Sequence, residues 1–251
     1  MKTLFGQPGR EALRAALQAQ PLLAFDFDGT LSPIVEHAGD ARVAPEVAQR
    51  LDRLARLRPV AVVTGRSVAD VTHRLGFAPR FIVGSHGAED PGREFGLDLS
   101  PLDRLRARLD ARRAALGATG VQVEDKTYSF ALHYRMAPDP GKALQTIQSS
   151  LVGLEPGLQS FGGKSVINVV LSGAPDKADA VASLMRRAGC DRAVFVGDDL
   201  NDEAVFERAL PNWLTVRVGR DYPQSRASFF LDGFAEMEEL LDTMLDVLQA
   251  L

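Results

Sequence analysis

The chain has 251 residues, a length at which one hydrophobic core stops growing and a second domain begins to separate. Its hydrophobic content of 45% is enough for a sizeable core, and its net charge of −4 excludes the basic surface that nucleic acid or an anionic membrane would need. The single cysteine, Cys190, excludes an internal disulfide, which is typical of a reducing cytoplasm.

No part of the sequence predicts a secretion signal or a membrane segment. The first 20 residues carry Lys2, Arg10, Glu11 and Arg14 without an uninterrupted apolar core, so we expect no signal peptide. No run approaches the ~18 apolar residues that a membrane-spanning helix requires. We therefore expect a cytoplasmic protein that has neither nucleic acid nor a membrane among its partners.

The first part of the chain alternates strands and helices. Apolar runs predict strands at 22–27, 60–63 and 81–83, and apolar residues at helical spacing predict a helix over 45–58. Ser67 is placed to cap a further helix after the second strand. Near-continuous apolar strands separated by helices favour a parallel sheet covered on both faces. Ligands of such sheets bind outside the carboxyl ends of the strands.

The pattern changes near Gly96 and returns near residue 174. Between these points we expect a helix over 102–116, strands at 121–124 and 129–135, a helix near 142–152, and strands at 159–161 and 165–171. Helices segregated from sequential antiparallel strands favour an α+β module. A helix at 176–188, strands at 193–196 and 213–218, and a closing helix at 236–248 then follow. We predict an α/β core of residues 1–95 and 174–251, interrupted by a module of residues 96–173.

The strand at 22–27 leads into Asp26-Phe27-Asp28-Gly29-Thr30. Residues two apart in a strand point to the same side, so both carboxylates lie beside one point. One can attack an electrophile and the other can move protons, with a hard cation offsetting their repulsion. An EF-hand loop is excluded, because Leu31 and His37 stand where it needs glycine and glutamate. Taken alone, the stretch could also be a strand that ends in solvated aspartates.

Three more predicted element ends carry groups that phosphoryl transfer needs. Thr64 offers a hydroxyl and a nearby N–H to phosphate oxygens, and Lys177 offers a compact charge at a helix N-terminus. The cluster Gly197-Asp198-Asp199-Leu200-Asn201-Asp202 offers three carboxylates to a cation. Each feature alone is commonplace in turns, caps and solvated helices. Their succession in this order is a strong signal.

The four motifs together resemble those of the haloacid dehalogenase superfamily of phosphatases. The resemblance implies a Rossmann-like core with an inserted cap, and an aspartyl-phosphate formed on Asp26. It implies that Asp28 is the general acid and base, and that Thr64 and Lys177 hold the phosphate. It implies Mg²⁺ as the cofactor. The metal ligands that follow from it are Asp26, Asp28, Asp198, Asp199 and Asp202.

The module narrows the resemblance. Several stretches are similar to the trehalose-6-phosphate phosphatase family, whose cap holds the disaccharide over the core. They are 84–89 (Gly-Ser-His-Gly-Ala-Glu), 123–126 (Val-Glu-Asp-Lys), Ser129, 133–135 (His-Tyr-Arg) and Asp176-Lys177. The similarity implies hydrolysis of trehalose 6-phosphate to trehalose and phosphate. The substrate-binding residues that it implies are Gly29, Thr30, Arg66, His86, Gly87, Glu124, Lys126, Arg135 and Asn168. Polar residues on a packed hairpin suit sugar hydroxyls, and the alternative is that they form surface ion pairs.

The module departs from that family at several positions. Asn168 stands where glutamate is usual, no Arg-Pro pair follows it, and Asn201 stands where threonine is frequent. The phosphoryl-transfer groups are unaffected, so the alternatives concern the sugar: sucrose phosphate or a glycosyl-phosphoglycerate. A non-catalytic sugar-phosphate sensor is a further alternative, against which Asp28 argues, since a binder needs no proton-transfer residue there. The oligomeric state stays open.

Two other patterns are set aside. Gly163-Lys164-Ser165 resembles part of a P-loop, but the earlier glycine that a P-loop needs falls on Leu158, and a strand rather than a helix follows. A basic run lies on one predicted helix with Asp103 and Asp110 interspersed, so we expect a solvated face rather than a polyanion site. The run consists of Arg104, Arg106, Arg108, Arg112 and Arg113.

Overall fold

The computed structural model describes residues 2–93 and 96–251. They form two compact units, Met1–Pro91 with Pro175–Leu251, and Gly92–Ala174. The sequence placed the corresponding limits at 95/96 and 173/174, and residue 95 lies outside the described residues. That each unit has its own function stays a prediction. Along the described chain, no helix is long and apolar enough to cross a membrane.

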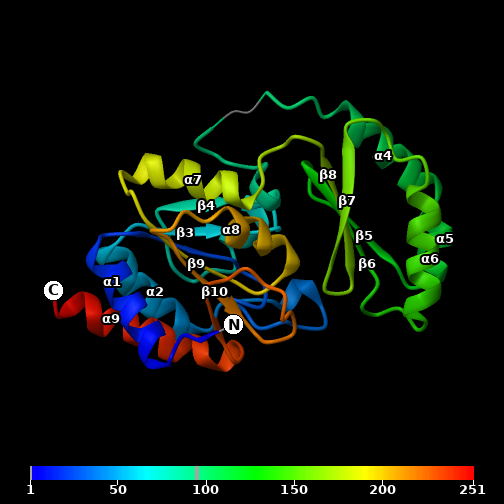
Figure 1. Ribbon diagram of the computed structural model, residues 1–251. Helices are drawn as coiled ribbons and strands as arrows, with labels where there is room; N and C mark the ends of the chain where they lie inside the picture. Colours follow the sequence, from blue (N-terminus) through cyan, green and yellow to red (C-terminus); the bar gives the residue numbers. More distant parts are fainter. Residues whose placement is uncertain (1, 94–95) are drawn as a thin grey trace. The chain divides into compact units, whose positions relative to one another are not determined.

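Seven strands of the larger unit form one parallel sheet (Figure 1). Its order is β1-β11-β10-β9-β2-β3-β4. The strands are β1 (Lys2–Thr3), β2 (Leu22–Phe25), β3 (Val60–Val63), β4 (Phe81–Val83), β9 (Ala193–Gly197), β10 (Leu214–Val218) and β11 (Phe229–Leu231). The apolar runs of β2, β3 and β9 are fully buried and lie side by side at the centre of the sheet. The residues that follow β2, β3 and β9 therefore lie at the same edge of the sheet, the one formed by the carboxyl ends of the strands.

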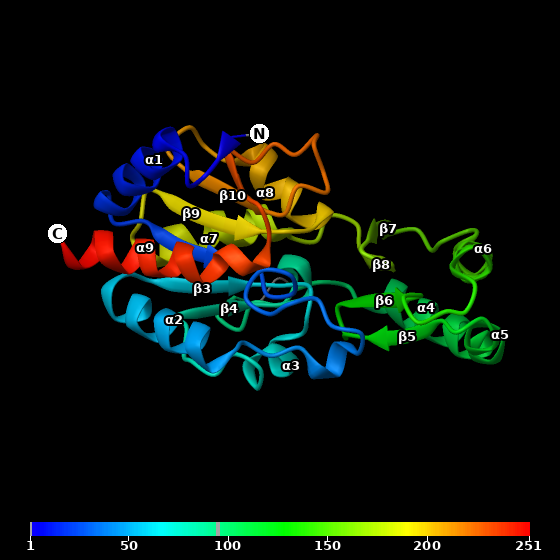
Figure 2. The same cartoon turned by 90° about the horizontal axis from the view of Figure 1, so that it is seen from below.

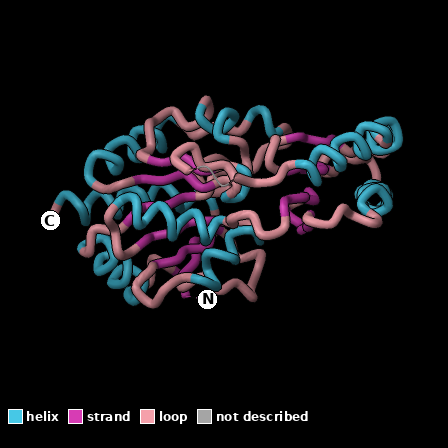
Figure 3. The backbone as a smooth tube through the Cα atoms, turned by 90° about the horizontal axis from the view of Figure 1, so that it is seen from above, coloured by secondary structure: helices cyan, strands magenta, loops and turns pink. Residues whose placement is uncertain are grey.

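Helices cover both faces of this sheet, as Figure 3 also shows. Leu23 and Phe25 of β2 pack into one core cluster, with α1 (Gln7–Gln18), α2 (Pro45–Leu57) and α9 (Met237–Gln249). Leu22 and Ala24 pack into the other, with α7 (Lys177–Ala188) and α8 (Glu203–Arg208). The alternation follows from the two-residue period of a strand. The short helix α3 (Val68–Thr72) follows β3, and Ser67 caps it as predicted by accepting from the Asp70 N–H.

The smaller unit is a four-stranded antiparallel sheet with helices on one side. The sheet order is β5-β6-β8-β7, with β5 (Gln122–Asp125), β6 (Ser129–His133), β7 (Leu158–Gly163) and β8 (Val166–Leu171). Figures 1 and 2 both show α4 (Ser100–Ala111), α5 (Arg113–Ala118) and α6 (Pro140–Leu151) on the same side. Phe130 and Leu132 of β6 face these helices in a common core. Ser129, Ala131 and His133 consequently point to the opposite face.

The predicted fold class, an α/β parallel-sheet core with an inserted α+β module, is confirmed. The hydrophobic pattern of the sequence did not predict β1, α1, α8 or β11. Pro8 and Gly9 at the start of α1 resemble helix breakers, yet proline is tolerated in the first turn. The strands β1 and β11 have two and three residues, too few for a visible period. The helix expected over 102–116 is divided at Arg112 into α4 and α5.

The basic run on these two helices is engaged within its own unit. Arg104 and Arg106 bond to the carboxylates of Glu155 and Asp125. Arg108 and Arg112 donate to backbone carbonyls at the end of α6, and Arg113 bonds to Asp110. These arginines therefore stabilise the module, which supports the expectation of a solvated face over that of a polyanion site.

Candidate active site

Three candidate side chains stand at the carboxyl ends of adjacent parallel strands. Asp26 follows β2, Thr64 follows β3 and Asp198 follows β9. The sheet hydrogen bonds continue past the strands, because the Asp26 N–H donates to the Val196 carbonyl and the Thr64 N–H to the Val83 carbonyl, both at 2.9 Å. All three side chains are buried. The backbone that carries them is thus fixed by the sheet itself.

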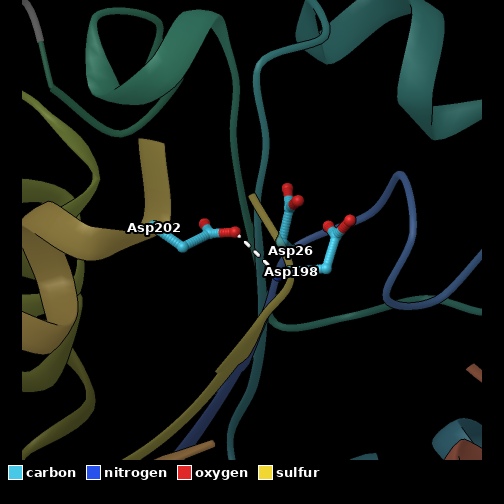
Figure 4. Close-up of side chains that lie close together, drawn as sticks. All are labelled: Asp26, Asp198 and Asp202. Carbon is cyan, nitrogen blue, oxygen red and sulfur yellow. Dashed lines mark hydrogen bonds between the residues drawn. The ribbon is translucent and has the colours of Figure 1, made fainter. Parts of the chain in front are cut away.

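Asp26, Asp198 and Asp202 form a buried acidic cluster (Figure 4). Each offers a carboxylate oxygen, and these oxygens lie within 4.8 Å of one another. Burial, together with the charges of Asp202 and Asp198, raises the pKa of Asp26 well above its usual value. Carboxylates held this close need a cation to offset their repulsion, and hard oxygen donors are the ligands that Mg²⁺ prefers. The donor set therefore fits the predicted metal.

Lys177 connects two members of the cluster. Its Nζ lies 2.9 Å from Asp26 Oδ1 and 2.7 Å from Asp202 Oδ1, and its side chain is buried. Burial alone would lower the pKa of Lys177, but the two carboxylates outweigh it and hold that pKa above its usual value. Lys177 is consequently charged at neutral pH. A capping box of Asp176 with Asp179 starts α7 at this residue, which fixes where the ammonium lies.

Asp202 holds Lys177 and the backbone of the turn after β9 in place through hydrogen bonds. Its Oδ1 accepts from Lys177, and its Oδ2 accepts from the backbone N–H groups of Asp198 and Asp199, at 2.9 and 3.0 Å. Figure 4 shows its carboxylate directed toward Asp26 and Asp198, whose own carboxylates lie side by side. Both oxygens of Asp202 are thus occupied, so Asp26 and Asp198 are the stronger candidates for direct metal ligands.

Two of the five expected metal ligands are not brought into the cluster. Asp199 instead caps the turn after β9, since its carboxylate accepts from the Leu200 N–H and the Asn201 amide. The Asp28 carboxylate is bound by Arg66, whose Nε and Nη2 each donate to it at 2.7 Å. The structure therefore separates Asp28 from the carboxylates that surround Lys177.

Gly29 and Thr30 support Asp198. Gly29 has φ +80°, and a Cβ there would lie 2.1 Å from Asp198 Oδ2, so only glycine fits this position. The Thr30 hydroxyl lies 3.5 Å from Asp198 Oδ1. Both were expected to contact the substrate. What the structure shows is that they place the Asp198 carboxylate, and their contact with substrate stays a prediction.

His86 and Gly87 connect the Thr64 loop to the start of α7. The His86 N–H donates to the Thr64 carbonyl at 3.0 Å, and the His86 ring lies against Gly65, where a Cβ would meet it at 2.4 Å. Gly87 has φ +119°, and a Cβ there would lie 2.3 Å from the Asp176 carbonyl oxygen. These close approaches tie two of the phosphate-binding candidates, Thr64 and Lys177, to one another through the loop at 84–87.

In the smaller unit, Glu124 and Asn168 share a row across the sheet. Both are paired with Ala131, Glu124 from β5 and Asn168 from β8. Directly opposed residues of antiparallel strands point to the same face, and here it is the face that α4, α5 and α6 leave uncovered. Lys126 Nζ lies 3.5 Å from Glu124, and Arg135 donates to the Lys164 carbonyl at 3.1 Å. An ion pair, the alternative to sugar binding for these residues, is therefore present between Lys126 and Glu124.

His133 and Ser129 belong to the motif that carries the family resemblance, but they were not among the expected substrate-binding residues. His133 Nε2 lies 2.9 Å from Glu124 Oε2, and His133 is paired with Gln122 on the same face of the sheet. The Ser129 hydroxyl points to this face too and makes no hydrogen bond with a described residue. The register of the β5–β6 hairpin was the available signal, because it places both residues beside Glu124.

Solved structures with this fold define its class. A haloacid dehalogenase-like hydrolase of Bacteroides thetaiotaomicron superposes with a TM-score of 0.61 at 14% identity, over 88% of this chain and 98% of that one. The C-terminal domain of C. albicans trehalose-6-phosphate phosphatase superposes with a TM-score of 0.80 at 21% identity, over 98% of both chains. The fold is that of the haloacid dehalogenase-like hydrolases, with a lysine-bridged acidic cluster at the carboxyl edge of its sheet.

Sequence comparison gives the family. A trehalose-phosphate phosphatase of Mycolicibacterium paratuberculosis is 33% identical over 250 residues, covering 91% of this chain and 63% of that protein. Another, of Mycobacterium tuberculosis, is 31% identical over 258 residues, covering 90% and 61%. The trehalose-phosphatase family model matches residues 24–221, and the chain belongs to that family. It spans about three-fifths of the length of these curated relatives.

Proposed function

We propose that this chain is a Mg²⁺-dependent phosphatase that hydrolyses trehalose 6-phosphate to trehalose and phosphate. The observation that carries the proposal is the buried cluster of Asp26, Asp198 and Asp202, bridged by Lys177, at the carboxyl edge of a parallel sheet. Membership of the trehalose-phosphatase family supports the substrate. A cytoplasmic location, with a small sugar phosphate rather than nucleic acid or a membrane as partner, belongs to the same proposal.

The proposed reaction has two steps. A carboxylate oxygen of Asp26 attacks phosphorus while the bond from phosphorus to the sugar O6 breaks. The electron pair of that bond leaves with O6, which takes a proton from Asp28, so that trehalose departs as a neutral alcohol. Asp28, now a carboxylate, then removes a proton from water, and the water oxygen attacks the aspartyl-phosphate to release phosphate and regenerate Asp26.

The charges around Asp26 suit this chemistry. The Lys177 ammonium lies against its Oδ1 and can hold a phosphate oxygen, and Thr64, at the end of the neighbouring strand β3, is the second proposed phosphate contact. Mg²⁺ bound by Asp26 and Asp198 would offset the repulsion between the carboxylates and the incoming phosphate. We propose that Asp28 takes part in proton transfer alone, because its carboxylate lies outside the acidic cluster of Asp26, Asp198 and Asp202.

We propose that the smaller unit, residues 96–173, recognises the sugar. Its sheet face opposite α4, α5 and α6 carries Glu124, His133, Ser129 and Asn168, which supply acceptors and donors for hydroxyl groups, and of these Ser129 and Asn168 are buried. Lys126 and Arg135 flank that face with positive charge, and each is a further candidate contact. The core of residues 1–95 and 174–251 is the proposed phosphatase domain.

Phosphate release from a panel of sugar phosphates tests the proposal. With Mg²⁺, we expect the highest kcat/KM for trehalose 6-phosphate, above sucrose phosphate and glucosyl-phosphoglycerate, and loss of activity in EDTA that added Mg²⁺ restores. Asp198→Asn should raise the Mg²⁺ concentration needed for half-maximal activity, since one ligand loses its charge. If another sugar phosphate gave a higher kcat/KM, that compound would replace trehalose 6-phosphate as the proposed substrate. Absence of turnover on the whole panel would leave a binding protein.

A further inference from the structure

The guanidinium of Arg66 forms a bidentate ion pair with the carboxylate of Asp28. Nε donates to Asp28 Oδ2 and Nη2 donates to Asp28 Oδ1, both at 2.7 Å, which is the two-pronged geometry of a strong arginine–carboxylate pair. The Arg66 side chain is 7% exposed, whereas that of Asp28 is 39% exposed. The arginine is thus the buried, fixed member of the pair, and the carboxylate is the member open to a ligand.

The far side of the guanidinium is anchored as well. Nη1 donates to Asp70 Oδ2 at 2.8 Å, and Nη2 also donates to the Ala38 carbonyl at 3.0 Å. Asp70 is itself held by Arg74, whose Nη2 lies 2.6 Å from Asp70 Oδ1, and Arg74 continues to the Gly39 carbonyl at 2.6 Å. A chain of alternating charges therefore runs from Asp28 to the backbone of the turn at residues 38–40.

Local structure fixes this chain in place. Ser67 caps α3 by accepting from the Asp70 N–H, so Asp70 sits at a defined position in the first helical turn. Its carboxylate then reaches Arg66, four residues before it, and Arg74, four residues after it, both just outside α3. The Phe27 ring, between the two motif aspartates, lies 5.1 Å from the Arg66 guanidinium carbon.

These bonds leave the guanidinium little capacity for a substrate phosphate. An arginine offers five N–H donors in a fixed fork. Asp28 takes two of them, Ala38 one and Asp70 one. A phosphate that bound Arg66 with two prongs would have to displace the Asp28 carboxylate, which the proposed reaction needs close to the leaving oxygen.

We propose that Arg66 is a positioning residue for Asp28, and not a ligand of the substrate. It orients the Asp28 side chain for the proton transfers of the proposed reaction, with Asp70 and Arg74 as its anchor. The inference rests on the proposed phosphatase function, and it changes the role that the sequence suggested for Arg66. A lysine at this position would keep the charge but lose the planar fork.

A double-mutant cycle with Asp28 tests this role. The variants are Arg66→Met, Asp28→Asn and the pair together, assayed for kcat/KM on trehalose 6-phosphate and on p-nitrophenyl phosphate, with inorganic phosphate as a competitive inhibitor. Arg66→Met should lower kcat/KM for trehalose 6-phosphate by roughly ten- to a hundred-fold, which is at most the lower limit of the ~10²–10⁴-fold that general acid catalysis provides. In the Asp28→Asn background it should have no further effect, because the group that it positions is gone.

Two readouts separate positioning from phosphate binding. p-Nitrophenolate leaves without a proton, so Arg66→Met should change kcat/KM for p-nitrophenyl phosphate by less than about threefold. The inhibition constant of phosphate should be equally unaffected. The matched control is Arg50→Met, which removes an arginine with the same two-pronged geometry whose partner is Asp242 of α9 rather than a residue of the candidate site. It should leave both substrates at wild-type rates.

Each outcome decides the inference. A tenfold weaker phosphate inhibition in Arg66→Met, equal losses on both substrates, or additive losses with Asp28→Asn would overturn it and make Arg66 a substrate ligand. If Arg66→Met gives no cooperative melting transition, Arg66→Lys takes its place in the same cycle, with the same expectations at smaller amplitude. Failure of the wild-type chain to release phosphate would overturn the proposed function itself, and is thereby distinguishable from failure of the inference.

Discussion

The core site and the face of the smaller sheet opposite α4, α5 and α6 are built in different ways. In the core, Lys177, Asp26 and Asp202 come from three distant segments and hold one another in place. On the smaller sheet, Glu124 and Asn168 lie in one row set by strand register, and Glu124 bonds to its neighbours His133 and Lys126. The first arrangement depends on every member being present. The second can change one side chain at a time.

Close backbone approaches strengthen this contrast. Gly29 and Gly197 admit the carboxylates of Asp198 and Asp202 at positions that a Cβ would occupy, and Gly87 admits the backbone that precedes Lys177. Substitutions there would move several site residues together. On the smaller sheet, the two-residue period of the strands alone decides which side chains share a face. We infer that the chemistry is fixed by the core, and that sugar preference is adjustable on the smaller unit.

The nucleophile offers the largest expected effect. Asp26→Asn keeps the shape of the side chain but removes the attacking charge, so turnover of trehalose 6-phosphate and of p-nitrophenyl phosphate should both fall below detection. Thermal unfolding should remain cooperative, because the amide still fills the same buried place. Phosphate release and a melting curve check both statements. Turnover within tenfold of the wild type would show that Asp26 does not carry the reaction.

Loss of the buried ammonium should cost stability as well as activity. Lys177→Met leaves Asp26 and Asp202 buried beside each other without their cation, and breaking a buried ion pair on one side costs about 3–5 kcal/mol. Arg50→Met, which breaks a partly exposed pair, should cost at most about 1 kcal/mol. Denaturant unfolding of both variants measures the difference. Equal losses would contradict the claim that the core site is mutually dependent.

Substitutions at two adjacent residues test whether the sheet face opposite α4, α5 and α6 binds the sugar. Glu124→Ala removes a charged hydrogen-bond partner from the proposed sugar site, which should lower kcat/KM for trehalose 6-phosphate by roughly ten- to a hundred-fold. Asp125→Ala is the matched control: it lies next in β5, points to the other face and pairs with Arg106 of α4. It should leave kcat/KM unchanged. Steady-state kinetics in which both variants lose activity alike would remove the reason to assign sugar binding to this face.

The smallest effect concerns pH and Asp70. Hydrogen bonds and charge from Arg74 and Arg66 outweigh burial and lower the pKa of Asp70 below its usual value. A carboxylate with a lowered folded-state pKa stabilises the fold above its unfolded pKa of about 3.9, and that stability is lost as pH falls through the folded pKa. Asp70→Asn should therefore lower Tm by a few degrees at pH 7 and by less near pH 3. Tm differences that grow toward acid would contradict this sign.

The sequence predicted the site where local order determines it. Asp26, Thr64 and Asp198 follow apolar strands whose pairing order is parallel, so their meeting at one edge follows from topology. Lys177 was placed at the start of a predicted helix, and the structure shows that Asp176 and Asp179 cap this helix. The positions of these residues along the chain were therefore enough to assemble the acidic cluster.

Contacts between distant side chains could not be predicted in the same way. Nothing in the spacing of Asp28 and Arg66, 38 residues apart, indicates that they pair, because the contact depends on how the loop after β3 turns into α3. The anchoring of Asp202 by Lys177 is of the same kind. The short strands β1 and β11 were missed for a different reason, since two or three residues carry no period.

Acid-quench measurement of the phosphoryl group on Asp26 tests the division of labour most directly. Wild-type chain and Glu124→Ala are mixed with trehalose 6-phosphate or p-nitrophenyl phosphate, quenched, and the modified peptide is identified by mass. We expect Asp26 to be labelled with both substrates. Glu124→Ala should slow labelling by trehalose 6-phosphate roughly ten- to a hundred-fold and leave labelling by p-nitrophenyl phosphate at the wild-type rate. Labelling at another residue, or equal slowing with both substrates, would contradict this division of labour.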